Sequence, residues 1–243
     1  MKTAVVTGAS SGIGDAICKE LLNSGFVVYG ISRTRPQFRH ASFRWIQLDL
    51  TKTQNIPRTA AQISETSIDL LINAAGTAGK HTGLDFDEKI FHRIFDLNFL
   101  APIYLASSLK NKLKRSLIIN ISSTSDRIAE PGYALYCSSK AALNMYFDVV
   151  SLEQKNCKVI SILPDYVDTP LLRKEIGSEA FDWDKTMKPE HVASFVGSIV
   201  GNHAHIPTGA RIMVLNTATL GSFSKKELLY AYNVDTDTLI SSQ

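Results

Sequence analysis

Short apolar runs alternate along this chain with longer segments in which apolar residues recur at helical spacing. The runs are apolar nearly throughout, as expected of strands that are covered on both faces. Strands are predicted at these runs: Thr3–Thr7, Val27–Ser32, Phe43–Leu48, Leu70–Asn73, Ser116–Ser122, Val159–Leu163 and Arg211–Leu215. Helices are predicted at the longer segments: Ile13–Leu22, Asp87–Leu109 and Ala134–Leu152. This alternation favours one α/β domain over residues 1–243, doubly wound around a central parallel sheet of about seven strands with helices on its faces.

The composition and charge exclude several classes of function. With 243 residues, 44% hydrophobic and 20% charged, the chain can bury one large core. A net charge of +3 is too small to indicate nucleic acid or a membrane surface as a partner. The three cysteines show no CxxC spacing, which predicts reduced thiols and a cytoplasmic protein. His203 and His205 have no supporting cysteine or carboxylate cluster, so no metal is expected.

A glycine-rich turn joins the first predicted strand to the first predicted helix and reads TGASSGIG. Gly8 permits a tight turn, Gly12 lets the backbone approach a pyrophosphate, and Gly14 allows the helix to pack closely on the strand. The free N–H groups of the helix N-terminus attract phosphate. The alternative is a flexible loop with surplus glycines. The predicted phosphate contacts are Gly8, Ser10, Ser11, Gly12, Ile13 and Gly14.

A tyrosine and a lysine four residues apart lie on one face of the predicted helix that begins near Ala134. A free phenol has a pKa of about 10, and a nearby ammonium lowers it towards neutrality, where the group can serve as acid or base. The alternative for Tyr136 is a half-buried core aromatic. Ser123 ends the preceding strand, and strand alternation turns Ser122 to the opposite face.

Together these motifs resemble the short-chain dehydrogenase/reductase family. The resemblance extends from residue 3 to about residue 215 and rests on Thr7–Gly14, Asn73-Ala-Ala-Gly76, Asn98, Ser123, Tyr136-x-x-x-Lys140 and Pro164-x-x-Val167-x-Thr169. It implies a Rossmann-type fold, a nicotinamide cofactor and hydride transfer.

The resemblance also implies roles for four catalytic residues. Tyr136 would exchange a proton with the substrate oxygen, and Lys140 would lower the pKa of the phenol and bind the nicotinamide ribose. Ser123 would donate a hydrogen bond to the substrate carbonyl. Asn98 would hold a water that relays protons to the lysine. Asparagine is unfavourable inside a helix, so we expect a local distortion there.

Further cofactor contacts follow from the same resemblance. Asp49 and Leu50 would contact the adenine, although an ordinary turn or helix cap explains Asp49 equally well. Asn73 would tie the centre of the sheet together, while the small residues after it pass close to the adenosine ribose. Around the nicotinamide carboxamide, Asp165 replaces the family's usual glycine. The remaining expected contacts are Ala74, Ala75, Gly76, Pro164, Val167 and Thr169.

The end of the second strand indicates which cofactor is used. A carboxylate at this position would accept a hydrogen bond from the 2′-hydroxyl of NAD. The chain has Ser32 there, followed by Arg33, whose guanidinium can pair with a 2′-phosphate. We therefore predict NADPH/NADP. A solvated basic loop would explain Arg35 and Arg39 but not the missing acid.

Residues 165–188 would cover the substrate. Phe181 and Trp183 could close the site against water or pack this segment onto the body of the protein. Tyr133 and Tyr166 are further candidates for residues that line the substrate site. In the family a glycine often lies three residues after the catalytic serine. This chain has Asp126 at that position, followed by Arg127. These two residues could line the cleft, but pairing with each other is the favoured interpretation.

The last segment departs most from the family. Residues 217–243 form an extension, and Val214-Leu-Asn-Thr217 stands where many relatives read V-D-G-G. The family segment often lies in a tetramer interface, so a homodimer or homotetramer is expected, with the tetramer in doubt. Ser224-Lys-Lys-Glu227 resembles a capping box and predicts a short helix through Tyr232, as a cover for the substrate, a contact with another subunit or a surface appendage.

The favoured function is an NADPH-dependent carbonyl reductase that acts on a ketone or aldehyde, with Tyr136 as general acid. The alternatives are a 3-oxoacyl thioester reductase, a hydroxysteroid or sugar-alcohol dehydrogenase, and an NADP-binding regulator without turnover. The expected partner is a small carbonyl or alcohol substrate.

Overall fold

The computed structural model describes residues 1–223 and 230–241. Within these residues one sheet has nine strands in the order β3-β2-β1-β4-β5-β6-β7-β8-β9. Its first eight strands run parallel, and β9 is antiparallel to β8. The strands are β1 (Thr3–Thr7), β2 (Val27–Ser32), β3 (Phe43–Gln47), β4 (Leu70–Asn73), β5 (Ser116–Ile121), β6 (Cys157–Pro164), β7 (Ala210–Leu215), β8 (Tyr230–Asn233) and β9 (Thr238–Ser241).

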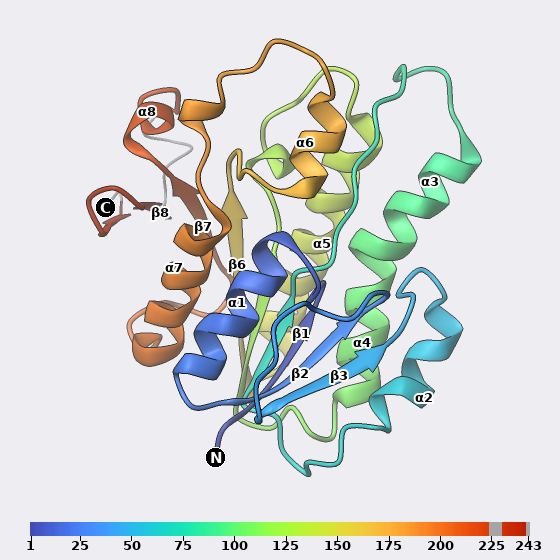
Figure 1. Cartoon of the computed structure of the whole chain (residues 1–243), viewed down its shortest axis with the longest axis vertical. Coiled ribbons are helices and arrows are strands. Elements are labelled where there is room, and N and C mark those ends of the chain that lie inside the picture. Colours follow the sequence, from blue (N-terminus) through green and yellow to red (C-terminus); the bar gives the residue numbers. More distant parts are fainter. Residues whose placement is uncertain (224–229, 242–243) are drawn as a thin grey trace.

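Helices connect the parallel strands and cover both faces of the sheet (Figure 1). The α-helices are α1 (Gly12–Asn23), α2 (Ile56–Ala60), α3 (Glu88–Phe95), α4 (Ala101–Leu109), α5 (Ala134–Glu153), α6 (Pro170–Ile176), α7 (Pro189–Asn202) and α8 (Thr217–Leu220). The short helical turns are η1 (Thr53–Asn55), η2 (Asp96–Leu100), η3 (Thr124–Asp126) and η4 (Trp183–Lys185).

The predicted α/β fold is confirmed, and each of the predicted strands forms, with ends that shift by at most two residues. The expected count of about seven strands was too low, because β8 and β9 extend the sheet. The long helix expected over Asp87–Leu109 is divided into α3, α4 and an intervening π-helical turn, η2. The distortion expected at Asn98 is therefore present.

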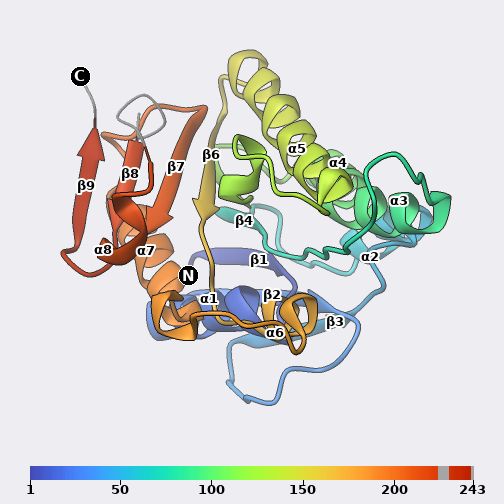
Figure 2. The same cartoon turned by 90° about the horizontal axis from the view of Figure 1, so that it is seen from above.

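Two apolar layers hold the sheet between its helices. α1 and α7 pack on one face, while α2, α4 and α5 cover the other (Figure 2). Side chains of β1 show the division, because Val6 belongs to the first layer and Val5 to the second. Strands that are buried on both faces require the continuous Val, Ile and Leu runs seen in the sequence.

The connections place two loops side by side at the carboxyl ends of the strands. The chain continues from β1 to β2 and β3 on one side, and β4 then returns to the other side of β1. Ligands bind at such a reversal of strand order in open α/β sheets. Thr7 joins the two loops there, because its Oγ1 accepts hydrogen bonds from the N–H groups of Ala74 and Ala75, each at 3.0 Å.

The C-terminal segment forms a β-hairpin instead of the expected helix through Tyr232. β8 pairs with β7, and Ala231 packs against the otherwise open apolar side of β7. The ring of Tyr232 stacks on Phe195 of α7, with centroids 4.0 Å apart. Pairing with a sheet edge satisfies the backbone, which outweighs local helix signals. The capping-box residues 224–227 lie outside the described residues.

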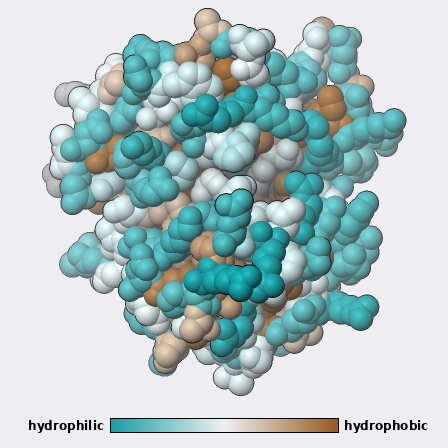
Figure 3. Space-filling model, viewed as in Figure 1, coloured by the Kyte–Doolittle hydropathy of each residue, from teal (hydrophilic) through white to brown (hydrophobic). Residues whose placement is uncertain are grey.

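The surface carries mixed polarity. On the face shown in Figure 3, hydrophilic side chains predominate and hydrophobic ones gather in small patches. None of the helices in the described ranges is both long and apolar enough to span a membrane.

Candidate active site

The end of β5 presents Ser123 towards the first turn of α5. Ser123 is extended (φ −163°) and caps η3, where its Oγ accepts a hydrogen bond from the N–H of Ser125 at 3.2 Å. Ser123 and Tyr136 both line the same cavity. Ser122 instead accepts a hydrogen bond from Asn144 of α5 at 2.9 Å. The choice of Ser123 over Ser122 therefore agrees with the geometry.

Tyr136 and Lys140 lie together on α5, with the Lys140 Nζ 5.7 Å from the centroid of the phenol ring. Burial raises the pKa of Tyr136 to about 12, which the nearby hydroxyl of Ser123 partly opposes. Burial also lowers the pKa of Lys140 to about 8, and its ammonium donates a 3.0 Å hydrogen bond to the carbonyl of Ile121. Burial therefore affects the pKa of the phenol more strongly than the neighbouring ammonium does, and the phenol is protonated at neutral pH.

Asn98 is buried in the π-helical turn η2 and joins a loop to α5. Its Oδ1 accepts from the N–H of Thr77 at 2.9 Å, and its Nδ2 donates to the carbonyl of Thr77 at 2.9 Å. Nδ2 also donates to Ser139 Oγ at 3.0 Å. These bonds hold the loop after β4 against the helix that carries Tyr136. The role of Asn98 in a proton relay stays a prediction.

A first cavity, of about 160 Å³, opens at the N-terminus of α1. Gly8 and Gly12 adopt positive φ angles of 72° and 56°. A Cβ at Gly14 would lie 2.3 Å from the carbonyl oxygen of Gly8, so only glycine permits this turn. The lining includes Gly8, Ser11, Gly12, Ile13, Gly14, Ala74, Ala75, Gly76, Tyr136, Lys140 and Thr169. A glycine cradle that leads from a helix N-terminus to the tyrosine and lysine fits a nicotinamide dinucleotide.

Ser32, Arg33 and Asp49 are the residues that the sequence predicts for the adenosine end of the cofactor. Ser32 is buried, donates to the carbonyl of Thr34 at 2.7 Å and accepts from Trp45 Nε1 at 3.1 Å. The side chain of Ser32 thus shapes the loop, while Arg33 is exposed beside it. The carboxylate of Asp49 accepts from the Thr51 N–H at 3.1 Å, which is the turn considered as its alternative.

The other residues predicted to contact the cofactor lie in the core, at a helix cap and in loops at the ends of strands. Asn73 donates to Asn120 Oδ1 at 2.8 Å and links β4 to β5, as expected for a residue at the centre of the sheet. Leu50 is buried in the core. Thr169 caps α6 by accepting from the Leu172 N–H at 3.2 Å, and its methyl group faces Gly12. The predicted residues Ser10, Pro164 and Val167 lie in the loop after β1 and around the end of β6.

A second cavity, of about 180 Å³, adjoins the first at Tyr136. Its lining includes Ser123 together with Tyr133 and Tyr166, the expected wall residues. Phe181 and Trp183 are absent from this lining in the described structure. Phe181 instead packs against Tyr166, with ring centroids 5.3 Å apart, and contacts Trp183 at 4.9 Å. These contacts agree with the alternative in which the two side chains pack the segment after α6 onto the body of the protein.

Ser125 and Glu130 both line this cavity and were missed in the sequence analysis. Ser125 Oγ lies 2.9 Å from Ser123 Oγ and donates to the carboxylate of Glu130. An ionised carboxylate only accepts hydrogen bonds, so the hydroxyl proton of Ser125 points to Glu130. No period or motif marks these residues, since the turn η3 alone brings them together.

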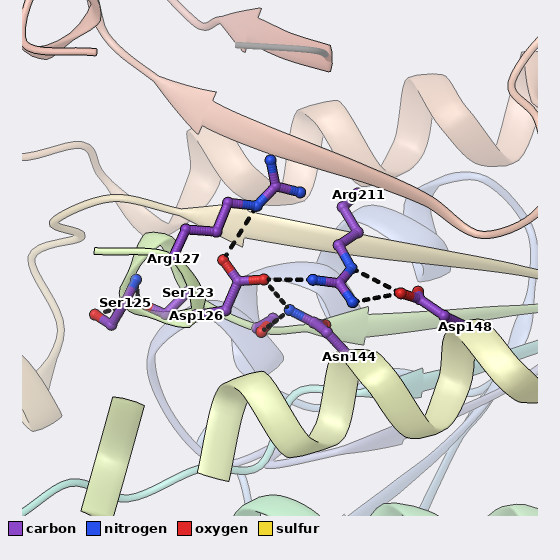
Figure 4. Close-up of polar contacts among 8 residues, drawn as sticks. Ser123, Ser125, Asp126, Arg127, Asn144, Asp148 and Arg211 are labelled. Carbon is purple, nitrogen blue, oxygen red and sulfur yellow. Dashed lines mark hydrogen bonds and ion pairs between the residues drawn. The ribbon is translucent and has the colours of Figure 1, made fainter. Parts of the chain in front are cut away.

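Asp126 belongs to a buried ion-pair network behind the catalytic serine. In Figure 4 its carboxylate lies between Arg127 and Arg211 and accepts from Asn144. The distances are 3.4 Å from Arg127 Nε, 3.1 Å from Arg211 and 2.8 Å from Asn144 Nδ2. Arg211 also pairs with Asp148. Asp126 and Arg127 thus pair with each other, as favoured, and the network ties η3 to α5 and β7.

Groups of three or more His, Cys, Asp or Glu side chains arranged for a metal ion are not found among the residues that the structure describes.

Comparison with known proteins adds family and cofactor information. A family model described as short chain dehydrogenase matches residues 2–179. The chain is 28% identical over 233 residues to an NAD-dependent glycerol dehydrogenase of Listeria innocua, with 88% of this chain and 92% of that protein covered. It is 31% identical over 216 residues to the NADPH-dependent 1-acyldihydroxyacetone phosphate reductase of Saccharomyces cerevisiae, with 78% and 73% covered.

Among solved structures, a short chain dehydrogenase family protein from Francisella tularensis superposes with a TM-score of 0.80 at 27% identity. The match covers 88% of this chain and 96% of that one. The Listeria relative is named as NAD-dependent and the Saccharomyces relative as NADPH-dependent. Similarity to these proteins therefore does not decide between NAD and NADP.

Proposed function

This chain belongs to the short-chain dehydrogenase/reductase family, and from that premise we propose that it is an NADPH-dependent carbonyl reductase. The family assignment makes it an oxidoreductase that acts on alcohol or carbonyl groups with a nicotinamide cofactor. The observation that carries the finer proposal is the meeting of two cavities at one tyrosine. Tyr136 lines both the glycine cradle and the second cavity, so a cofactor and a substrate can meet beside its phenol.

The side chains around Tyr136 suit the reduction of a carbonyl. A bound nicotinamide cofactor supplies the hydride. Tyr136, with its pKa raised by burial to about 12, donates its phenol proton to the oxygen that gains negative charge. Ser123 stabilises that oxygen with a hydrogen bond. Lys140, positioned beside the phenol and Gly76, holds a positive charge near the developing phenolate and can reach the ribose of the cofactor.

The preference for NADP rests on the loop after β2. Ser32 is occupied by bonds to Thr34 and Trp45, and no carboxylate follows β2 to repel a phosphate. Arg33 is exposed beside this loop, where its guanidinium can pair with a 2′-phosphate. These features support NADPH as the physiological cofactor and, with it, the direction of reduction.

We also propose that the protein is a cytoplasmic homodimer. Cys18, Cys137 and Cys157 are free thiols, which supports a reducing compartment. Large apolar side chains are exposed along α5, where a second copy could cover them. β8 covers the edge of β7, which favours the dimer over the tetramer.

The test is NADPH oxidation with diketones, quinones, aldehydes and acyl thioesters, with NADH in parallel. Replacing Tyr136 by Phe removes the proton donor and is expected to lower kcat by about a hundredfold or more. The variant Tyr136→Phe should still bind NADPH, as measured by calorimetry. Tyr104→Phe, the same change at an exposed position of α4, is the matched control. Normal turnover by Tyr136→Phe would contradict the proposal.

A further inference from the structure

Three acidic side chains line the substrate cavity. Glu130 follows η3, Asp165 follows β6, and Glu175 lies on α6, so three separate segments contribute them. Each is half-buried. No lysine, arginine or histidine lines this cavity within residues 1–223 and 230–241. Carboxylates that are partly withdrawn from water attract cations and repel anions more strongly than exposed ones.

Cationic side chains close to the cavity wall are engaged elsewhere. Lys80 pairs with Glu179, and its ammonium lies 5.9 Å from the centroid of the Tyr133 ring. Arg173 makes a bidentate pair with Asp168, with both distances 2.6 Å, and lies over Trp183. Lys140 lies 5.7 Å from the centroid of the Tyr136 ring and donates to the carbonyl of Ile121. Among the described residues, none of these three cations forms an ion pair with the acids of the cavity wall.

Aromatic rings complete the same wall. Tyr133, Tyr136 and Tyr166 line the cavity with the acids, and the face of an aromatic ring attracts a cation. The phenols respond to the negative field: burial and the nearby Glu175 raise the pKa of Tyr133 to about 12. Tyrosine faces together with carboxylates form the kind of surface that binds ammonium groups.

Glu175 is the acid that is free to bind a ligand. Glu130 accepts from Ser125, and Asp165 is engaged by Thr124 at 3.4 Å. The side chain of Glu175 makes no hydrogen bond or ion pair with the rest of the described chain, yet it lines the cavity from α6. Its carboxylate is thus a ready partner for a positive group at the far side of a substrate.

We propose that the substrate is an amino ketone or amino alcohol, whose protonated amine binds Glu175 and the tyrosine rings while its oxygen reaches Tyr136 and Ser123. This inference rests on the proposed function, because it concerns the substrate of the same site. It implies that substrates with a carboxylate or a phosphate beside the carbonyl are poor.

Three six-membered ketones that differ in charge test the proposal. N-methyl-4-piperidone is a cation when protonated, 4-methylcyclohexanone is its neutral analogue, and 4-oxocyclohexanecarboxylate is an anion. At a pH where the amine is protonated, kcat/KM with NADPH should be at least about tenfold higher for the cation than for the neutral ketone. The anion should be reduced more slowly than the neutral ketone.

Variants identify the acid responsible. Glu175→Gln should reduce the advantage of the cation by about tenfold and leave the neutral ketone nearly unchanged. Glu190→Gln, the same change at an exposed position of α7, is the matched control. N-methylpiperidine has no carbonyl and should inhibit the native enzyme competitively, but Glu175→Gln more weakly. This inhibition measures binding alone.

The outcomes separate this inference from the proposed function. Equal rates for the three ketones, or an undiminished cation preference in Glu175→Gln, would refute the amine site while carbonyl reduction stands. No NADPH oxidation with any carbonyl compound, together with normal NADPH binding, would instead overturn the proposed function.

Discussion

At the scale of single residues, burial shifts the pKa values of Tyr136 and Lys140 in opposite directions. The phenol of Tyr136 is made a weaker acid, with a pKa of about 12, and the ammonium of Lys140 a stronger one, with a pKa of about 8. Both shifts follow from the same cause, because a low-dielectric surrounding disfavours the charged form of each group. Near neutral pH, Tyr136 therefore holds its proton and Lys140 its charge, which is the state required for reduction.

The pH dependence of reduction follows from these shifts. Below about pH 8 Lys140 is charged, and above it the charge is lost, so kcat/KM for reduction should fall as pH rises through about 8. In Lys140→Arg the guanidinium stays charged, and the fall should move to higher pH. Steady-state rates from neutral to alkaline pH measure this, with circular dichroism as the folding control. A fall at the same pH in both proteins would exclude Lys140 as its origin.

Arg33 should determine the choice between the two cofactors. Replacing Arg33 by Ala removes a charged hydrogen-bond donor and is expected to lower the ratio of kcat/KM for NADPH over NADH by about tenfold or more. Arg58→Ala removes an exposed arginine on α2 and serves as the control. If the ratio is the same in Arg33→Ala and the native protein, another residue reads the 2′-phosphate.

At the scale of elements, the site depends on how η3 is anchored. The carboxylate of Asp126 is fully buried and is held by Arg211 of β7 and Asn144 of α5. Ser122 bonds the same asparagine, so the network fixes both sides of the turn that presents Ser123. A buried carboxylate is costly without its partners, which makes the anchoring of η3 sensitive to residues far from the substrate.

Removing Arg211 alone should destabilise the protein more than removing the charges of Arg211 and Asp126 together. Arg211→Met leaves Asp126 buried with fewer partners and should lower the free energy of unfolding by about 3 kcal/mol. The double variant Arg211→Met with Asp126→Asn should recover much of that loss. Urea denaturation of the two variants measures the difference. A loss in the single variant that is no larger than in the double variant would contradict this account of the network.

At the scale of the whole molecule, the added hairpin and the exposed helix face bear on assembly. β8 occupies the edge of β7, so that edge cannot pair with a second copy. The exposed apolar side chains gather instead on α5, where Met145, Tyr146, Val149 and Leu152 recur at helical spacing. An apolar stripe of this kind is covered when two copies pack helix against helix.

A charge on this stripe should produce a monomer. Met145→Glu places a carboxylate at a position that is 60% exposed, so the fold should tolerate it while the helix contact between copies does not. Leu239→Glu, at a 47% exposed position on β9, should leave the dimer intact. Sedimentation velocity distinguishes the two. Dissociation by Leu239→Glu instead would place the contact on the hairpin edge.

Much of the fold and part of the site could be predicted from local patterns. The strands and the glycine turn depend on short stretches whose residue types restrict the backbone, as the positive φ of Gly8 shows. The spacing of Tyr136 and Lys140 is likewise set by one helix. Ser125 and Glu130 could not be found in this way, because a turn after β5 joins them, and neither belongs to a periodic pattern.

The sequence by itself determined the parallel α/β sheet, the glycine cradle and the pairing of Tyr136 with Lys140, because each depends on neighbours along the chain. Only the tertiary structure decided that the C-terminal segment becomes a hairpin, since the exposed edge of β7 offers backbone partners that no local propensity anticipates. It also decided that Glu130, Asp165 and Glu175 line the cavity, whereas Phe181 and Trp183 are absent from its lining in the described residues. Contacts between distant segments set the polarity of a cavity, and the order of residues does not reveal them.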